Sequence, residues 1–262
     1  MKLQIVRKPS DLRKRIVRFL DSAHFSRGEF KILFQDLEKL GELAIFGGML
    51  RDISVLGSRG FTSDIDLVVK TNRAEDLKRL LTKYNTKINK FGGYRLVVDK
   101  RYIDIWSFDT TWAFQKGHVN GNELSDLCKT TFFDWDAIIF NYSSGMIHSI
   151  DNYVERLNQR ILNINLEPNP NPLAALSKAL KYCENYEAFL SNELALYFYK
   201  VLSSVINQPV SFPYKIKEIK NCNLSRLSFN NIYTSLDKYH QSQSDIPFTF
   251  FNQKDLSLNS YN

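Results

Sequence analysis

The sequence predicts an α+β protein, in which a mixed sheet with flanking helices precedes a smaller helical region. Two patterns lead to this prediction. Short apolar strands alternate with amphipathic helices up to about residue 150, and the spacing of apolar residues becomes helical after that point. The composition agrees with a folded protein that buries a core, since 44% of the 262 residues are hydrophobic and 24% are charged.

The first region contains segments with the apolar runs or alternation expected of strands. Two amphipathic helices precede them, and helices are expected at 49–56 and 74–84. The expected strands lie at 43–46, 65–69, 94–98, 101–106, 136–141 and 146–150. The third and fourth form a hairpin around Asp99-Lys100, and the last two form a pair around 143–145.

The expected domains are residues 1–165, which contain the sheet, and residues 166–262, which are helical. The Pro- and Asn-rich stretch Glu167–Pro172 separates them. Helices are expected at 173–190 and 193–205. The stretch from residue 207 onward is expected to be a tail that either folds back onto the helices through the apolar segment 246–251 or is partly mobile.

The charge and the N-terminal sequence set expectations about partners and location. A net charge of +7 favours polyanionic partners such as nucleic acid or nucleotides. The basic N-terminus has no apolar segment typical of a signal peptide, and no stretch is long enough to cross a membrane. The three cysteines are widely spaced, which suits a reducing compartment. We therefore expect a cytoplasmic protein with no membrane partner.

Two carboxylates stand one residue apart at the start of an apolar strand. Because side chains alternate along a strand, Asp64 and Asp66 are expected to point to one face while Ile65 and Leu67 point into the core. Two nearby carboxylates repel each other and stay ionised in an apolar setting only with a cation between them. Oxygen ligands suit Mg²⁺, which binds one or two carboxylates together with substrate phosphates.

A third acid, Asp104, lies within the strand 101–106, between Ile103 and Ile105, which are expected to face away from it. If the two strands are neighbours, the three carboxylates converge. The sequence therefore predicts a site for two Mg²⁺ ions on Asp64, Asp66 and Asp104, of the kind that holds both oxygens of a phosphoryl displacement.

A glycine pair, Gly47-Gly48, links a strand to a helix just before these acids. Glycine lets the backbone approach a ligand closely, and a helix start offers free N–H groups to a phosphate. Arg51 lies one turn into the helix, where its forked donors could reach the same anion. Ser63 precedes the acid pair and could bind a phosphate or close the turn. These four residues are the expected nucleotide-binding set.

This arrangement resembles the head domain of the bacterial-type (class II) tRNA nucleotidyltransferases and poly(A) polymerases, within the polymerase-β-like nucleotidyltransferase superfamily. The family's first motif is Gly-Gly-x-x-Arg-Asp, a loop and Asp-x-Asp, and here it reads GGMLRDISVLGSRGFTSDIDL. The segments DAIIFNYSSGMIHSIDNYVERLNQRIL and NPNPLAALSKALKYCENY are similar to later parts of the head and neck. The resemblance covers roughly residues 43–186.

The resemblance implies a nucleotidyltransferase-type sheet and a role for each matching residue. Asp64 and Asp66 would bind the catalytic Mg²⁺, Gly48 and Arg51 would contact the nucleotide, and Asp104 would help to activate the attacking hydroxyl. The chain departs from the family where Thr130 and the next two residues replace Arg-Arg-Asp, and it contains no evident Glu-Asp-x-x-Arg element for base selection.

The expected function is transfer of a nucleoside monophosphate from an NTP to an acceptor hydroxyl. RNA, in particular a tRNA 3′ end, is the leading acceptor, in a toxin or defence enzyme rather than in housekeeping repair. Two alternatives stay open. The nucleotide could pass to a protein or a small molecule such as an antibiotic, or the chain could be an inactive nucleotide- or RNA-binding module.

Overall fold

The computed structural model of the chain describes residues 3–22, 28–57, 60–61, 63–89, 92–207 and 227–251. The Cα positions group into two compact units, one from Leu3 to Asn158 and one from Gln159 onward. The first contains the sheet and the predicted site residues. The prediction of two domains divided at residue 165 stays a prediction, and part of the expected tail lies outside the described residues.

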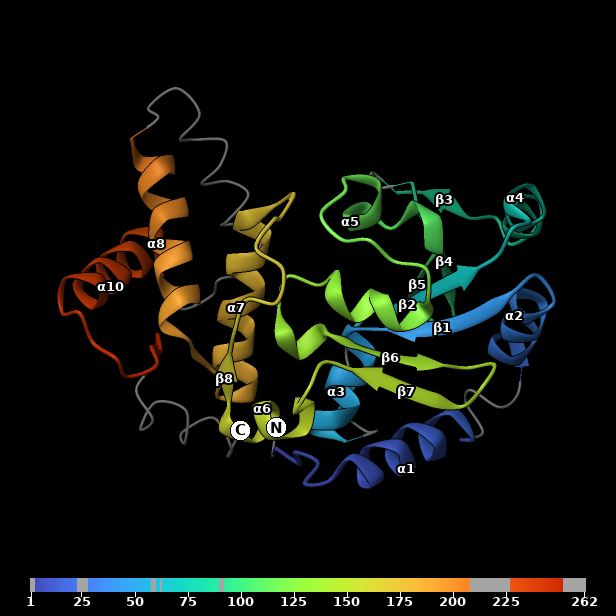
Figure 1. Ribbon diagram of the computed structural model, residues 1–262, viewed down its shortest axis with the longest axis horizontal. Helices are drawn as coiled ribbons and strands as arrows, with labels where there is room; N and C mark the ends of the chain where they lie inside the picture. The colour runs from blue at the N-terminus through green and yellow to red at the C-terminus, as the bar shows by residue number, and fades with distance from the viewer. Residues whose placement is uncertain are drawn as a thin grey trace. The chain divides into compact units, whose positions relative to one another are not determined.

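A mixed sheet forms the centre of the first unit, in the order β3-β4-β5-β2-β1-β6-β7 (Figure 1). Only the contact between β2 and β5 is parallel, and the other neighbours are antiparallel. The strands are β1 (Glu42–Phe46), β2 (Ile65–Lys70), β3 (Lys87–Ile88), β4 (Tyr94–Val98), β5 (Arg101–Ser107), β6 (Ile138–Asn141) and β7 (Met146–Ser149). A mixed sheet with flanking helices was expected, and this fold class is confirmed.

Helices and short 3₁₀ turns cover the sheet. The α-helices are α1 (Pro9–Leu20), α2 (Gly28–Glu38), α3 (Gly48–Leu56), α4 (Ala74–Lys83), α5 (Trp112–Gln115) and α6 (Tyr153–Gln159). The 3₁₀ turns are η1 (Phe108–Thr110), η2 (Leu124–Lys129) and η3 (Asp134–Asp136). Helix α3 is buried along its whole length, which fixes the glycine turn that starts it.

Side-chain alternation along β2 and β5 separates the core from the predicted site. Ile65, Leu67 and Ile103 are fully buried on one face. On the other face, Val68 joins a cluster with η1 and η2 that also contains Ala44, Phe108, Leu124, Leu127, Cys128 and Ile139. Because Asp66 lies two residues before Val68, it shares this second face, at the end of the strand nearer the glycine turn.

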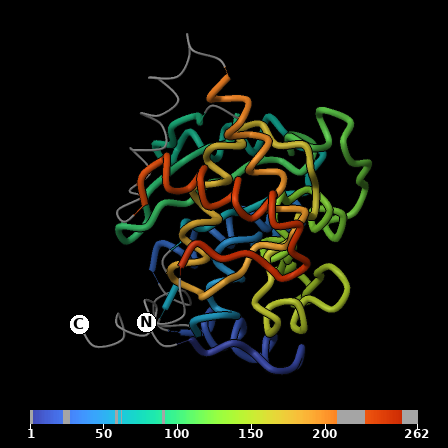
Figure 2. Tube along the Cα trace, turned by 90° about the vertical axis from the view of Figure 1, so that its left-hand side faces the viewer, coloured from blue at the N-terminus to red at the C-terminus, as the bar shows by residue number. Residues whose placement is uncertain are grey.

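The second unit is mainly helical. It contains β8 (Ile161–Leu162), α7 (Pro172–Tyr186), β9 (Phe189–Leu190), α8 (Asn192–Ile206) and α10 (Phe229–Gln241). Helix α10 lies against α8 (Figure 2). The backbone of Phe248 forms two hydrogen bonds with Leu190, of 2.7 and 2.8 Å, so the segment 246–251 folds back within this unit.

Two predictions about the second unit need correction. The expected helix 173–190 ends at Tyr186 because Glu187 takes a left-handed conformation, with φ of 52°. The stretch expected to be a tail contains helix α10, which begins at a Ser228 cap and buries Phe229, Ile232 and Leu236. Among the described residues, we find no helix with both the length and the apolar character needed to span a bilayer.

Candidate active site

The glycine turn ends β1 and begins α3. Gly47 has φ of +65°, a left-handed value that favours glycine, and its N–H donates to the carbonyl of Ile138 over 2.9 Å. Its own carbonyl accepts from the N–H of Arg51 at 3.0 Å. Since β1 runs antiparallel to β2 with Phe46 opposite Asp66, the turn lies beside the start of β2. The predicted glycines and acids are therefore brought together.

Ser63 faces Gly48 across the start of α3. A Cβ atom added to Gly48 would lie 3.4 Å from both Cβ and Oγ of Ser63, so glycine keeps this gap open. The Ser63 hydroxyl is buried and has no hydrogen-bond partner among the described residues. A buried polar group without a partner is costly, so a hydroxyl here beside the N–H groups of a helix start is suited to an anion.

Arg51 lies beneath this turn and bridges two buried carboxylates. Its Nε and one terminal nitrogen donate to Asp52 at 3.0 and 2.7 Å, and its other terminal nitrogen donates to Asp136 of η3. Arg51 is 3% exposed. The other oxygen of Asp52 accepts from the backbone N–H of Ser63 at 3.1 Å. Arg51 and Asp52 thus fix the loop before the acids, and the expected contact of Arg51 with a nucleotide stays a prediction.

Asp66 and Asp104 are direct neighbours on parallel strands. The register of β2 and β5 places Asp66 opposite Asp104, and the register of β4 and β5 places Arg95 opposite Asp104. Residues directly opposite in a sheet have side chains on the same face. Arg95, Asp104 and Asp66 therefore form one row across three strands. The condition for the acids to converge, that their two strands are neighbours, is met.

Arg95 joins two of the three acids. Its Nε donates to one oxygen of Asp104 at 2.9 Å, and a terminal nitrogen donates to the other oxygen at 2.5 Å. The same terminal nitrogen lies 3.2 Å from an oxygen of Asp64. The side chains of Arg95 and Asp64 are 42% and 44% exposed, while that of Asp104 is 11% exposed. This cluster is therefore open to solvent on one side.

Burial and the neighbouring charges shift the pKa values of the side chains in this cluster. Partial burial raises the pKa of the Asp64 carboxyl; Arg95 opposes the rise, and the negative Asp104 adds to it. The hydrogen bonds to Asp104 raise the pKa of Arg95 above its ordinary value, so the guanidinium stays charged. Arg95 therefore supplies a positive charge between Asp64 and Asp104, and the metal ion expected on Asp64 and Asp66 stays a prediction.

The donor set can be compared with what Mg²⁺ requires. Among the described residues, no group of three or more His, Cys, Asp or Glu side chains has the geometry of a metal site. The chemistry of the set nevertheless fits, because carboxylate oxygens are the ligands that Mg²⁺ prefers and a cation already bridges Asp64 and Asp104. Metal binding by these acids stays a prediction.

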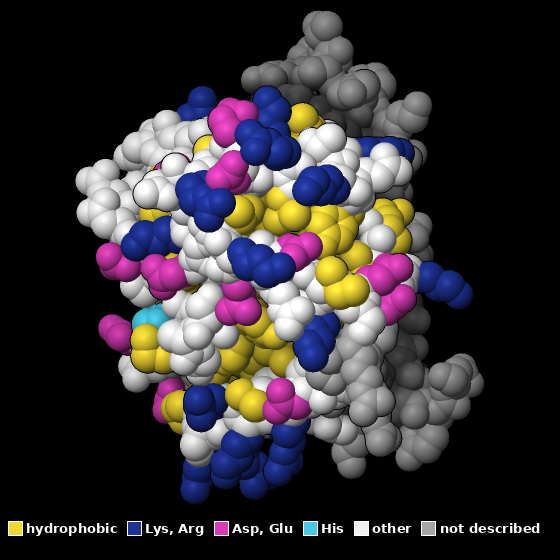
Figure 3. All heavy atoms as spheres, turned by 90° about the vertical axis from the view of Figure 1, so that its right-hand side faces the viewer, with side chains coloured by type: hydrophobic (Ala, Val, Ile, Leu, Met, Phe, Trp, Pro, Cys, Tyr) yellow, Lys and Arg dark blue, Asp and Glu magenta, His cyan; other side chains and the backbone are white. Residues whose placement is uncertain are grey.

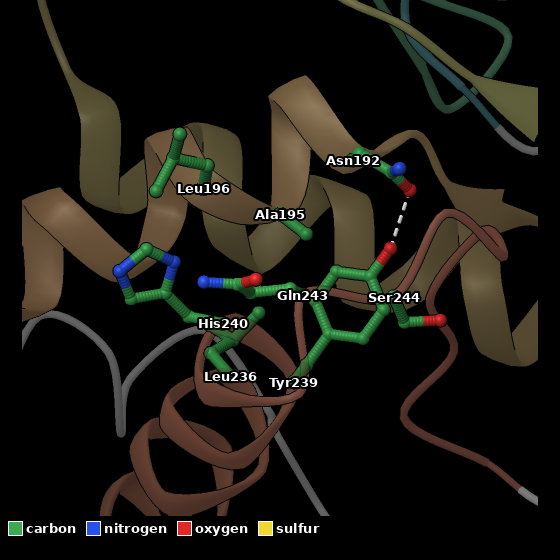
Figure 4. A pocket seen from close by; sticks show the side chains of 8 residues that line it. All are labelled: Asn192, Ala195, Leu196, Leu236, Tyr239, His240, Gln243 and Ser244. Carbon is green, nitrogen blue, oxygen red and sulfur yellow. Dashed lines mark hydrogen bonds between the residues drawn. The ribbon is translucent and has the colours of Figure 1, made fainter.

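A pocket in the second unit lacks the side chains that phosphoryl transfer needs. It holds about 130 Å³ between α8 and α10, and Tyr239 donates from one side of it to Asn192 (Figure 4). Its lining carries no carboxylate, and His240 is its one imidazole. Phosphoryl transfer needs a clustered charge to hold phosphates, which this pocket does not offer.

Comparison with known proteins adds evidence on the fold. The sequence matches no protein-family model and no curated protein. Solved structures do match. A tRNA-processing enzyme in an apo form has 20% identity and a TM-score of 0.51, over 86% of this chain and 63% of its own. The Thermotoga maritima CCA-adding enzyme complexed with tRNA has 16% identity and a TM-score of 0.55, over 89% and 55%.

A third structure, of a CCA-adding enzyme with ATP, has 17% identity and a TM-score of 0.55, over 92% of this chain and 54% of its own. The chain therefore spans about three fifths of the length of the structures that it matches. The fold is that of the tRNA nucleotidyltransferases, as the Gly-Gly and Asp-x-Asp motifs predicted. Because the sequence identity is this low, the similarity supports a shared fold alone.

Proposed function

We propose that this protein is a Mg²⁺-dependent nucleotidyltransferase that moves a nucleoside monophosphate from an NTP to a hydroxyl of RNA. One observation carries the proposal. The row of Asp104 and Asp66, to which Arg95 joins Asp64, lies beside the glycine turn, and the buried Ser63 hydroxyl near Gly48 has no partner among the described residues. Phosphoryl transfer requires carboxylates that can hold metal ions next to a group of donors that can bind phosphates.

The residues have distinct tasks in this proposal. The N–H groups at the start of α3 and the Ser63 hydroxyl bind the phosphates, while Gly48 keeps space for them. Asp64, Asp66 and Asp104 would hold Mg²⁺, which would neutralise charge on the phosphates and on the leaving pyrophosphate. Asp104 orients the acceptor hydroxyl and accepts its proton as the oxygen attacks the α-phosphorus.

RNA is the proposed acceptor because of the charge and the fold. The chain carries a net charge of +7. Figure 3 shows Lys and Arg side chains spread over the face on which α2 and α4 lie, with acidic side chains among them. Two of the structural neighbours were solved with tRNA or as a tRNA-processing enzyme with CTP. A tRNA 3′ end is therefore the first acceptor to test, and a toxin or defence role would follow from damage to that end.

The experiment is a label-transfer assay. Each α-³²P-labelled NTP is incubated with Mg²⁺ and total tRNA, using the wild-type chain and the Asp64→Ala, Asp66→Ala variant. Label on tRNA that disappears with the variant supports the proposal. Label on added protein or aminoglycoside instead of RNA would reassign the acceptor, and no label on any acceptor, with nucleotide still bound, would contradict transfer.

The inactive binding module is a second candidate, favoured by one observation. Arg95 neutralises part of the charge on Asp64 and Asp104, so these acids can persist without a metal. Binding of nucleotide that needs no Mg²⁺, together with the absence of transfer, would favour this reading.

A further inference from the structure

Arg95 makes the strongest polar contact in the acid cluster. Its fork engages both oxygens of Asp104, at 2.9 and 2.5 Å, and reaches Asp64 at 3.2 Å. Bidentate pairs of this kind are specific in geometry and stronger than single contacts. While they persist, the oxygens of Asp104 are directed at the guanidinium. A divalent cation on the same oxygens would have to compete with Arg95.

Arg95 is held near the acids by its position but is free to turn. The two-residue hairpin at Asp99 and Lys100, both with positive φ, sets the register that places Arg95 opposite Asp104. The guanidinium also lies 5.2 Å from the ring centre of Tyr102, which is 51% exposed. With 42% of its side chain exposed, Arg95 can swing toward solvent without repacking a core.

Electrostatics predicts the direction of such a movement. A guanidinium and a divalent cation on one carboxylate repel each other, so a cation that binds Asp104 weakens the hold of Arg95. The row of Arg95, Asp104 and Asp66 continues on the same face to Phe46, the residue before the glycine turn. A released guanidinium therefore faces the side of the sheet where the phosphates are proposed to bind, and its planar fork fits phosphate oxygens. The segment Thr130–Phe132, where the similar family carries arginines, offers no such group.

We propose that Arg95 is the movable cation of this site. It joins Asp64 and Asp104 until a divalent cation displaces it, and it then binds the phosphates of the nucleotide. This inference rests on the proposed function, since it assumes that the acids bind a metal and that the glycine turn binds the phosphates. It assigns to β4 a nucleotide-binding arginine.

The first test measures Mn²⁺ binding without nucleotide, from the electron paramagnetic resonance signal of free Mn²⁺. Arg95→Gln should bind Mn²⁺ about five- to tenfold more tightly than wild type, because the competing ion pair is gone. The matched control is Arg79→Gln, which removes the same charge from an exposed position on α4, and it should bind like wild type. Equal affinity in Arg95→Gln and wild type would overturn the proposal.

A conservative variant separates displacement from charge alone. Arg95→Lys keeps the positive charge but cannot engage both oxygens of Asp104 and Asp64 together. It should bind Mn²⁺ more tightly than wild type and more weakly than Arg95→Gln. An affinity equal to wild type in Arg95→Lys would mean that only the charge matters, and would contradict displacement of a bidentate contact.

The second test measures ATP binding in the presence of Ca²⁺, by calorimetry. Arg95→Gln should bind ATP about tenfold more weakly than wild type and Arg79→Gln, because a phosphate contact is missing. Unchanged ATP affinity would overturn the second half of the proposal. The Asp64→Asn, Asp66→Asn variant tells which idea has failed: if it still binds Mn²⁺ like wild type, the metal site of the proposed function is wrong, whatever Arg95 does.

Discussion

Two arginines in the first unit each bridge two carboxylates, and their surroundings differ. Arg51 holds Asp52 and Asp136 in the interior, where it is 3% exposed. Arg95 holds Asp64 and Asp104 at an open face, where 42% of its side chain is exposed. The first is shielded from solvent and ions, while the second is accessible to both.

The difference in exposure suggests that the two arginine–carboxylate clusters have separate roles. A buried ion pair cannot lose one partner without leaving an uncompensated charge, so the Arg51 network serves to fix the glycine turn and the loop at Ser63. The open side of the Arg95 cluster lets ions from solvent reach the carboxylates, so its cation can be exchanged for another. The buried network would then build the site, and the open cluster would perform its chemistry.

The largest expected effect comes from breaking the buried network. Asp52→Ala leaves Arg51 with one of its two carboxylates and frees the N–H of Ser63. We expect the free energy of unfolding to fall by about 3–5 kcal/mol. All three tryptophans lie in the first unit, so urea unfolding followed by tryptophan fluorescence measures this unit. A loss below about 1 kcal/mol, typical of a surface pair, would contradict a structural role for the network.

The conformation of the glycine turn, whose carbonyl accepts from the N–H of Arg51, can be tested next. Gly47→Ala places a side chain at φ of +65° and ψ of −113°, with only the Asp136 carbonyl near the new Cβ, at 3.6 Å. The cost is conformational rather than steric, and we expect a loss of about 1–3 kcal/mol in the same urea measurement. Gly117→Ala, also at positive φ but in open space, is the matched control. A much larger loss than in the control would show that the site adds strain of its own.

Asp126, outside both arginine clusters, allows the contribution of one carboxylate to stability to be measured as a function of pH. The Lys129 side chain and the N–H groups of Glu123 and Asn122 lower the pKa of Asp126 to about 2. Its unfolded pKa is near 3.9, so its stabilisation is present above about pH 4 and is lost as the pH falls toward 2. Asp126→Asn should cost about 1 kcal/mol at pH 7. The difference from wild type should shrink between pH 4 and 2; a constant difference would contradict this assignment.

The smallest effect on stability is expected in the open cluster. Asp104→Asn removes one carboxylate from Arg95, which still contacts Asp64 and water. We expect a change of less than about 1 kcal/mol in either direction, because the 42% exposed Arg95 can turn to water and the amide oxygen of the new Asn still accepts a hydrogen bond from it. A loss as large as that of Asp52→Ala would show that the two clusters do not differ in kind.

The sequence predicted much of this arrangement. The glycine turn, the strand that carries Asp66 and the hairpin around Asp99-Lys100 depend on local patterns, and the structure has all three. The hairpin also held more information than the prediction took from it. Because a two-residue turn fixes the register, the sequence also contained the pairing of Arg95 with Asp104, which the prediction did not use.

Other features depend on contacts that the sequence does not encode locally. The pairing of Asp66 with Asp104 is a parallel register between strands that are separated by a helix and a hairpin. The orientation of Arg51 is set by Asp136, from a 3₁₀ turn far along the chain. The segment from 108 to 135 forms short 3₁₀ turns and the four-residue helix α5 without a helical or strand period, so the sequence pattern predicted no element there.

The most direct test of the central claim is the rate of label transfer by Asp104→Asn, at a concentration of folded protein matched to wild type. The assay uses α-³²P-labelled nucleotide, Mg²⁺ and the RNA acceptor found with the wild-type chain. We expect the rate to fall by about a hundredfold or more, because the group that accepts the proton is lost while the fold is kept. A rate equal to that of wild type would contradict the assignment of the open carboxylate cluster as the active site.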